Sequence, residues 1–90
     1  MYADPHFNLG LTLTRQMKID EAIGEFRQAV ELSPRSYDAH AQLGIALAMQ
    51  DRIDEAIASF EEALRLRPDS EDAKKYLQLA RQQKAQRAGG

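Results

Sequence analysis

The sequence predicts an all-α protein built from two helix-turn-helix repeats and a C-terminal capping helix. Two observations predict this fold class. First, much of the 90-residue chain repeats at an interval of 34, and Pro34 and Pro68 stand one interval apart. Second, apolar residues recur at spacings of three and four, the period of an amphipathic α-helix. A fixed period of this length is typical of a solenoid, whose units are stabilised by stacking on one another.

The residues that match at this offset are mainly apolar or small, as expected of packed positions. They are Asp4/Asp38, Leu9/Leu43, Gly10/Gly44, Leu13/Leu47, Asp20/Asp54, Glu21/Glu55, Ala22/Ala56, Ile23/Ile57, Phe26/Phe60, Ala29/Ala63 and Leu32/Leu66. The apolar pattern breaks once inside each unit, which separates two helices. We therefore expect helices over 4–16, 20–32, 37–50 and 54–66.

The residues between these segments are suited to ending and starting helices. Pro34 and Pro68 follow the last apolar residue of the second helix in each unit, where a helix stops. Ser36 and Ser70 come next, and a serine hydroxyl there can accept a hydrogen bond from a free N–H of the following helix. We thus expect one repeat over residues 3–35 and a second over 36–69.

A fifth helix is expected from Glu71 to Gln86. It has one apolar stripe (Ala73, Tyr76, Leu77 and Ala80), and its other faces carry lysine, arginine and glutamine. A helix with one apolar face suits the end of a repeat array, because it covers the last repeat and exposes polar groups to water. Residues 70–86 therefore form the predicted solvating helix, and 87–90 a disordered tail.

Composition excludes several classes of protein. The net charge is −2 and there is no cysteine, so no disulfide or thiolate zinc site can form. No apolar run approaches the roughly 18 residues that a membrane span requires. The first residues lack the basic region and apolar run of a signal peptide, so we expect either a cytoplasmic protein or one whose targeting segment has been removed.

The C-terminal segment is basic, with five cations against two carboxylates from residue 70 onward. Such a helix can touch RNA or a membrane surface. Only one aromatic residue, Tyr76, accompanies these charges, and it lies on the predicted packed face. We interpret the charges as a solvated face and expect neither nucleic acid nor membrane as a partner.

No pattern typical of an enzyme is present. His6 and His40 are the only histidines, and they occupy the same repeat position, which favours packing between helices. They lack the spacing of a metal or catalytic motif. Asp20-Glu21 and Asp54-Glu55 open helices, where carboxylates stabilise the helix dipole. We expect a non-enzymatic protein with no catalytic residue, metal or cofactor.

The repeated residues resemble the tetratricopeptide repeat family. The family pattern reads here as His6, Leu9, Gly10, Leu13, Ala22, Phe26, Ala29 and Pro34, and again as His40, Leu43, Gly44, Leu47, Ala56, Phe60, Ala63 and Pro68. The family's usual Trp and Tyr are replaced by the histidines and by Leu13 and Leu47. Its frequent turn glycine is replaced by Met17 and Asp51. The resemblance covers residues 3 to about 84.

The resemblance implies a right-handed α–α superhelix that binds a peptide or protein segment in its concave groove. By analogy with the family, the groove would be lined by Asp4, Phe7, Leu11, Arg15, Asp38, Ala41, Ile45, Met49, Asp72, Lys75 and Leu79, with Thr14, Ala48, Gln82 and Gln83 beside them. The aspartates would form a ladder beside an apolar strip, which favours an apolar peptide with basic flanks.

Two other interpretations of the groove remain. The apolar strip could be covered by a second copy of the chain, as in a homo-oligomer, or by further repeats of a longer array. The basic clamp with which some family members hold chaperone C-termini is not matched, since its positions hold Phe7, Leu11, Gln42, Asp72 and Tyr76. A C-terminal carboxylate would meet no cation there, so we do not expect that partner.

Overall fold

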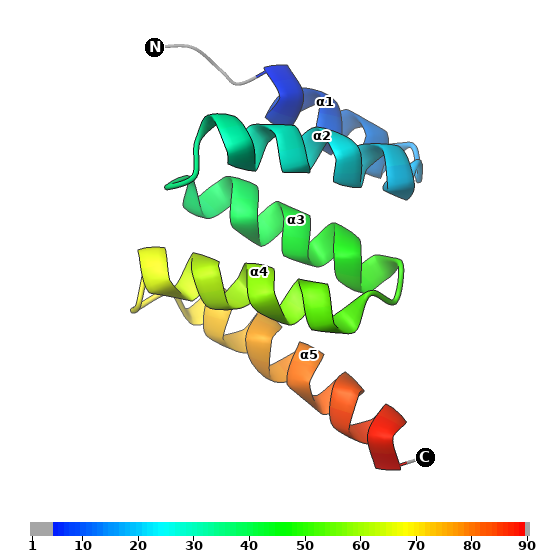
Figure 1. Ribbon diagram of the computed structural model, residues 1–90, viewed down its shortest axis with the longest axis vertical. Helices are drawn as coiled ribbons and strands as arrows, with labels where there is room; N and C mark the ends of the chain where they lie inside the picture. The colour runs from blue at the N-terminus through cyan, green and yellow to red at the C-terminus, as the bar shows by residue number, and fades with distance from the viewer. Residues whose placement is uncertain (1–4, 90) are drawn as a thin grey trace.

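The computed structural model describes residues 5–89, and the predicted helical array is confirmed (Figure 1). The helices are α1 (Pro5–Arg15), α2 (Ile19–Leu32), α3 (Tyr37–Met49), α4 (Ile53–Leu66) and α5 (Glu71–Gly89). α1 pairs with α2, α3 pairs with α4, and α5 packs on α4. We call α1, α3 and α5 the A helices, and α2 and α4 the B helices. The array measures 44 × 29 × 18 Å.

The predicted N-caps are present at α3 and α5. The hydroxyl of Ser36 accepts a hydrogen bond from the Ala39 N–H at 3.1 Å, and that of Ser70 accepts one from Ala73 at 3.1 Å. Ser70 also bonds the Tyr37 hydroxyl at 2.7 Å. This side-chain bond joins the start of α5 to the start of α3.

The C-terminal helix is longer than predicted. α5 continues to Gly89, so the expectation of disorder from residue 87 is wrong for 87–89. Its last turns contain residues of high helix propensity, and Lys84 and Arg87 form ion pairs with Asp54 and Asp51. Gly90 and Asp4, the expected start of the first helix, lie outside the described residues.

The turn inside each hairpin contains a residue in the left-handed backbone region. Met17 has a φ of 62° and Asp51 a φ of 67°, at the two positions where the family often has glycine. A side chain in this conformation is strained by contact between its Cβ and the backbone. Aspartate tolerates the conformation better than methionine, so the first turn is the less favourable of the two.

Each hairpin closes through a glycine that lies under a phenylalanine. A Cβ built on Gly10 would lie 2.5 Å from the Phe26 ring, and one on Gly44 would lie 2.5 Å from the Phe60 ring. The two phenylalanines are almost fully buried. The absence of a side chain at these glycines therefore allows the A and B helices to pack closely.

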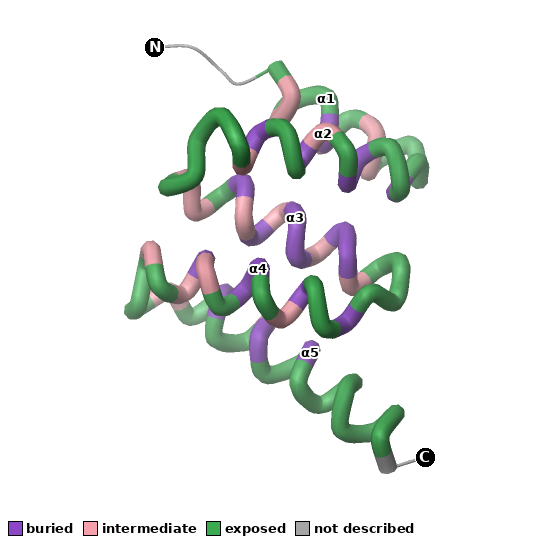
Figure 2. The backbone as a smooth tube through the Cα atoms, viewed as in Figure 1, coloured by how far each residue is buried: buried purple, intermediate pink, exposed green. Residues whose placement is uncertain are grey.

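Burial is greatest in the middle of the array (Figure 2). α3 packs against both α2 and α4, and it contains the largest set of buried residues among the A helices, whereas only Gly10 is buried in α1. The main core runs through both B helices and the inner faces of α3 and α5.

The histidines bond polar groups as well as occupying the bulky position of the repeat. His6 Nδ1 lies 2.7 Å from a carboxylate oxygen of Glu25, and His40 Nε2 lies 2.8 Å from the carbonyl oxygen of Pro34. Both side chains are partly exposed, so the expectation that they mainly fill space between helices is only partly right. His6 thus connects α1 to α2, and His40 connects α3 to the loop before it.

Candidate functional site: an apolar pocket between α3 and α5

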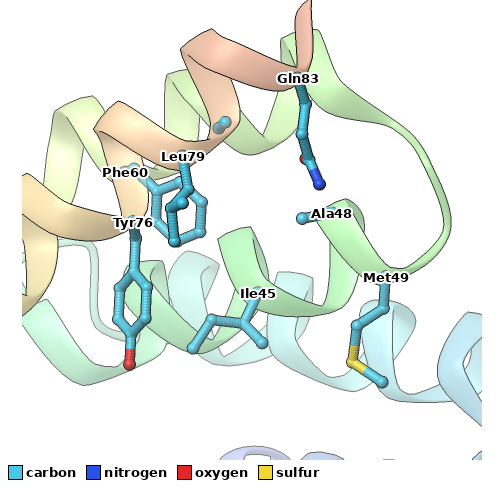
Figure 3. Close-up of a pocket in the computed structure, with 8 residues that line it drawn as sticks. Ile45, Ala48, Met49, Phe60, Tyr76, Leu79 and Gln83 are labelled. Carbon is cyan, nitrogen blue, oxygen red and sulfur yellow. The ribbon is translucent and has the colours of Figure 1, made fainter.

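An open pocket of about 440 Å³ lies between α3 and α5. Its walls are mainly apolar and come from three helices. The lining residues are Ile45, Ala48 and Met49 of α3, Phe60 of α4, and Tyr76, Leu79, Ala80 and Gln83 of α5. Figure 3 shows Tyr76 and Met49 at opposite sides, with Ile45 between them.

The helical period explains why these side chains meet. Ile45, Ala48 and Met49 are spaced by three and four residues, so they share one face of α3. Tyr76, Leu79, Ala80 and Gln83 share a face of α5 for the same reason. Phe60 reaches the pocket from beneath, and its ring stacks on Tyr76 with centroids 5.4 Å apart. The pocket thus forms wherever α5 docks correctly on α4.

Three of the expected groove residues meet in this pocket. Ile45, Met49 and Leu79 line it, together with Ala48 and Gln83. Met49 is 45% exposed and Leu79 51% exposed, and both border the same apolar pocket. These two residues therefore offer contact area to a ligand without any rearrangement of the fold.

Other expected groove residues lie elsewhere. Phe7 and Leu11 pack partly buried against the main core, and the Phe7 ring lies 5.9 Å from that of Phe26. Ala41 is only 6% exposed and packs with Ala63 and Ala73, contrary to the expectation that it lines the groove. It is buried because the start of α5 covers this part of α3.

The charged groove candidates are exposed. Arg15, Asp38, Asp72 and Lys75 all lie on the surface, and Asp4 lies outside the described residues. Among the described residues, neither Asp38 nor Asp72 has an ion-pair partner. They open α3 and α5, the two helices that supply most of the pocket wall.

Sequence reasoning missed Phe60, Tyr76 and Ala80 as pocket residues. The repeat pattern assigns all three to packing, and they do pack, but one edge of each also faces the pocket. Tyr76 has no counterpart of its kind in the repeats, where Asn8 and Gln42 occupy the equivalent positions. An aromatic residue at an otherwise polar position is the one signal that could have identified it.

The basic residues of α5 are mostly engaged with other parts of the molecule. Lys74 pairs with Glu71, Arg81 with Glu61 at 3.0 Å, Lys84 with Asp54 at 2.8 Å, and Arg87 with Asp51. Three of these pairs hold α5 against the second hairpin. The expectation of a solvated basic face is therefore refined, because these cations also have a structural role.

Two carboxyl groups with a lowered pKa, those of Glu55 and Glu62, lie away from the pocket. The hydrogen bond from Arg65 lowers the pKa of Glu62, and bonds from Arg52 and then Arg27 lower the pKa of Glu55. These pairs are exposed and none lines the pocket.

Over residues 5–89, no group of three His, Cys, Asp or Glu side chains is placed to hold a metal ion. No described helix combines the length and the apolar character needed to cross a membrane.

Stacked helical hairpins of similar length, with an apolar pocket on the face of the A helices, define a helical-repeat protein of the solenoid class. The chain belongs to the tetratricopeptide repeat family, whose model matches residues 7–71. No curated protein matches the chain. The family assignment supports a protein-interaction module.

Solved structures of MamA have the same fold. One structure of MamA AMB-1 is 32% identical with a TM-score of 0.84, and the match covers 89% of this chain and 44% of the MamA chain. A second structure of MamA AMB-1 has the same identity and TM-score, with coverages of 89% and 47%. MamA MSR-1 is 32% identical with a TM-score of 0.83, and the coverages are 89% and 46%. The chain thus spans about half the length of these proteins. The likeness confirms the predicted right-handed α–α superhelix.

Proposed function

We propose that the chain is a non-enzymatic scaffold that binds a peptide segment of another protein across α3 and α5. A bulky apolar side chain of the peptide enters the pocket, and basic residues beside it approach Asp38 and Asp72. The observation that carries this proposal is the pocket itself. It is open, apolar and bordered by the exposed side chains of Met49 and Leu79.

The size of the pocket and the surrounding charge support this class of ligand. A volume of about 440 Å³ falls within the range of small-ligand pockets, and it can accept one large side chain with room to spare. Asp38 and Asp72 pair with no cation of residues 5–89. A lysine or arginine of the peptide can therefore attract these carboxylates without displacing another cation of these residues. The Tyr76 hydroxyl and the Gln83 amide add hydrogen-bonding groups at the rim.

The test uses a panel of labelled peptides that carry Leu, Met or Phe as the anchor, with either lysine or glutamate flanks. We expect the lysine-flanked peptides to bind more tightly, with fluorescence anisotropy as the readout. Met49→Ser and Leu79→Ser should each weaken binding, because they remove apolar area from the pocket edge. The double variant Asp38→Asn, Asp72→Asn should abolish the preference for lysine and retain the preference for an apolar anchor.

Leu32→Ser is the matched control, because Leu32 is 64% exposed and does not line the pocket. This variant should bind as the unaltered chain does. Equal loss of binding in Leu32→Ser and Met49→Ser would contradict the proposal, as would the absence of binding by every peptide. Sedimentation tests the alternative: a dimer that Met49→Ser disrupts would show that a second copy occupies the groove.

A further inference from the structure

The thioether of Met49 gives the wall of the pocket a group that an oxidant can modify. The chain has three methionines and no cysteine, so all of its side-chain sulfur is in thioethers. Met49 is 45% exposed and Met17 is 69% exposed, whereas Met1 lies outside the described residues. Because exposure governs which sulfurs a dissolved oxidant reaches, Met17 and Met49 are both open to oxidation.

Met49 lies where a change of polarity affects a bound ligand. It is the last residue of α3, and its side chain forms the side of the pocket opposite Tyr76 (Figure 3). Its neighbours on the same face of α3 are Ile45 and Ala48, whose side chains contain no hydrogen-bond donor. An oxygen atom added to the sulfur must therefore keep its water or turn to the rim. In either case an apolar group beside it loses contact area.

The repeat itself shows that the fold accepts a polar side chain at this position. The residues one interval of 34 before and after Met49 are Arg15, the last residue of α1, and Gln83 of α5. Both side chains are exposed, as is that of Met49. Met49 is thus the apolar member of a position that otherwise holds polar groups. Oxidation of Met49 should consequently change the pocket and leave the helices in place.

We infer that Met49 is a modification site at which a peroxide weakens peptide binding between α3 and α5. The inference rests on the binding function proposed above. A lone pair of the sulfur attacks one oxygen of hydrogen peroxide, an S–O bond forms as the O–O bond breaks, and water leaves after proton transfer. The sulfur loses two electrons and the peroxide gains them. The product, methionine sulfoxide, is polar, and sulfoxide reductases return it to the thioether.

Met17 provides an internal control for this reaction. It is more exposed than Met49, but it lies in the turn between α1 and α2 and does not line the pocket. Hydrogen peroxide should therefore oxidise both residues, and only the sulfoxide at Met49 should affect binding. Leu79, the other exposed residue at the pocket edge, contains no sulfur, so the loss of binding should be partial.

The experiment compares peptide binding before and after treatment of the full chain with hydrogen peroxide. The probe is a labelled, lysine-flanked peptide with a leucine anchor and no sulfur, and catalase removes the peroxide before fluorescence anisotropy is measured. Mass spectrometry of proteolytic fragments reports the sulfoxide at each methionine. We expect binding to weaken at least about threefold when Met49 is oxidised, because a polar oxygen then borders the apolar anchor. Methionine sulfoxide reductases that act on both epimers should restore it.

Three variants assign the effect to one residue. The ratio of the Kd after treatment to the Kd before it is compared within each variant, so a change in untreated affinity does not enter the comparison. Met17→Leu should show the same ratio as the unaltered chain, and Met49→Leu should show a ratio of about one. Met49→Gln places a polar, uncharged side chain at the same position, and it should bind weakly without any oxidant.

The outcomes separate this inference from the proposed function. If no peptide binds the untreated chain, the proposed function fails and the inference fails with it. If peptides bind equally well once the Met49 sulfoxide has formed, or if Met49→Leu loses binding on treatment as the unaltered chain does, only the inference is overturned. It is also overturned if Met17 is oxidised while Met49 is not. A lower melting temperature of the oxidised chain would attribute the loss to unfolding, with the same consequence.

Discussion

The two hairpins share one sequence pattern, yet their equivalent residues are buried to different degrees. Leu13 of α1 is partly buried, whereas its equivalent Leu47 in α3 is 1% exposed. The difference arises because α3 lies between two B helices, whereas α1 packs mainly on one, α2. The pattern encodes a surface that is able to pack, and a neighbouring hairpin determines whether that surface is buried.

The largest expected effect tests this comparison in the core. Leu47→Ala should reduce the free energy of unfolding by about 2–5 kcal/mol, because it leaves a cavity in a fully packed site. Leu13→Ala should cost about half as much, since part of that side chain is already in water. Urea denaturation of both variants measures the two losses. Equal losses would show that the hairpins are packed alike in solution.

The next effect concerns the glycine–phenylalanine contact that occurs inside each hairpin. Gly44→Ala and Gly10→Ala should each destabilise the fold by about 1–3 kcal/mol, because the new methyl group would overlap the Phe60 or Phe26 ring. The two losses should be similar, in contrast to those of the leucines, since each contact lies within one hairpin. A thermal melt that is unchanged by either substitution would contradict the close approach of the helices.

The repeat period predicted most of the fold because the contacts within each hairpin depend on residues that recur. Gly10 and Phe26 meet for the same reason as Gly44 and Phe60, because both residues of the pair recur at the interval of 34. The end of α5 could not be predicted in this way, because the ion pair between Arg87 and Asp51 joins residues that are distant in sequence and outside the apolar pattern.

The candidate site was predictable only in part. Ile45, Met49 and Leu79 could be placed on one face from the family's groove positions, and the structure brings them together. Ala41 could not be excluded, since its burial depends on how far the start of α5 overlaps α3. Tyr76 joins the pocket because its ring stacks on Phe60, a contact that the repeat pattern does not contain.

A smaller, stabilising effect is expected in the turns. Met17→Gly should raise the free energy of unfolding by about 1 kcal/mol, because glycine adopts a φ of 62° without strain. Asp51→Gly should give less or nothing, since aspartate tolerates this conformation and the change removes the ion pair with Arg87. Thermal melts of the two variants compare the turns directly. An equal gain at both would indicate that side-chain identity does not affect the strain.

A similar gain is expected on the outer surface of α2. Gly24→Ala should stabilise the protein by about 0.5–1 kcal/mol, because a Cβ there meets no atom within 4 Å and alanine favours the helix. Ala58 already occupies the equivalent position in α4, so the change makes the two B helices alike. Gly10→Ala provides the opposite control in the same hairpin. Destabilisation by Gly24→Ala, measured in urea, would mean that this surface is covered in solution.

The smallest expected effect is a difference between the two hairpins in how their stability depends on pH. Hydrogen bonds from Arg52 and Arg27 hold the pKa of Glu55 below 4.5, so its contribution is present above that pH and is lost as the pH falls through the lower, folded-state value. Glu21, the equivalent residue of the first hairpin, has no arginine partner in the described chain. Glu55→Gln should therefore lower the urea midpoint at about pH 7 and have less effect at about pH 3, and this difference should be smaller for Glu21→Gln, which breaks no arginine pair. Because the Glu55 pair is exposed, added salt should shrink the difference. Identical pH profiles for the two variants would mean that the arginines do not hold Glu55 in solution, and that the second hairpin owes its advantage to burial alone.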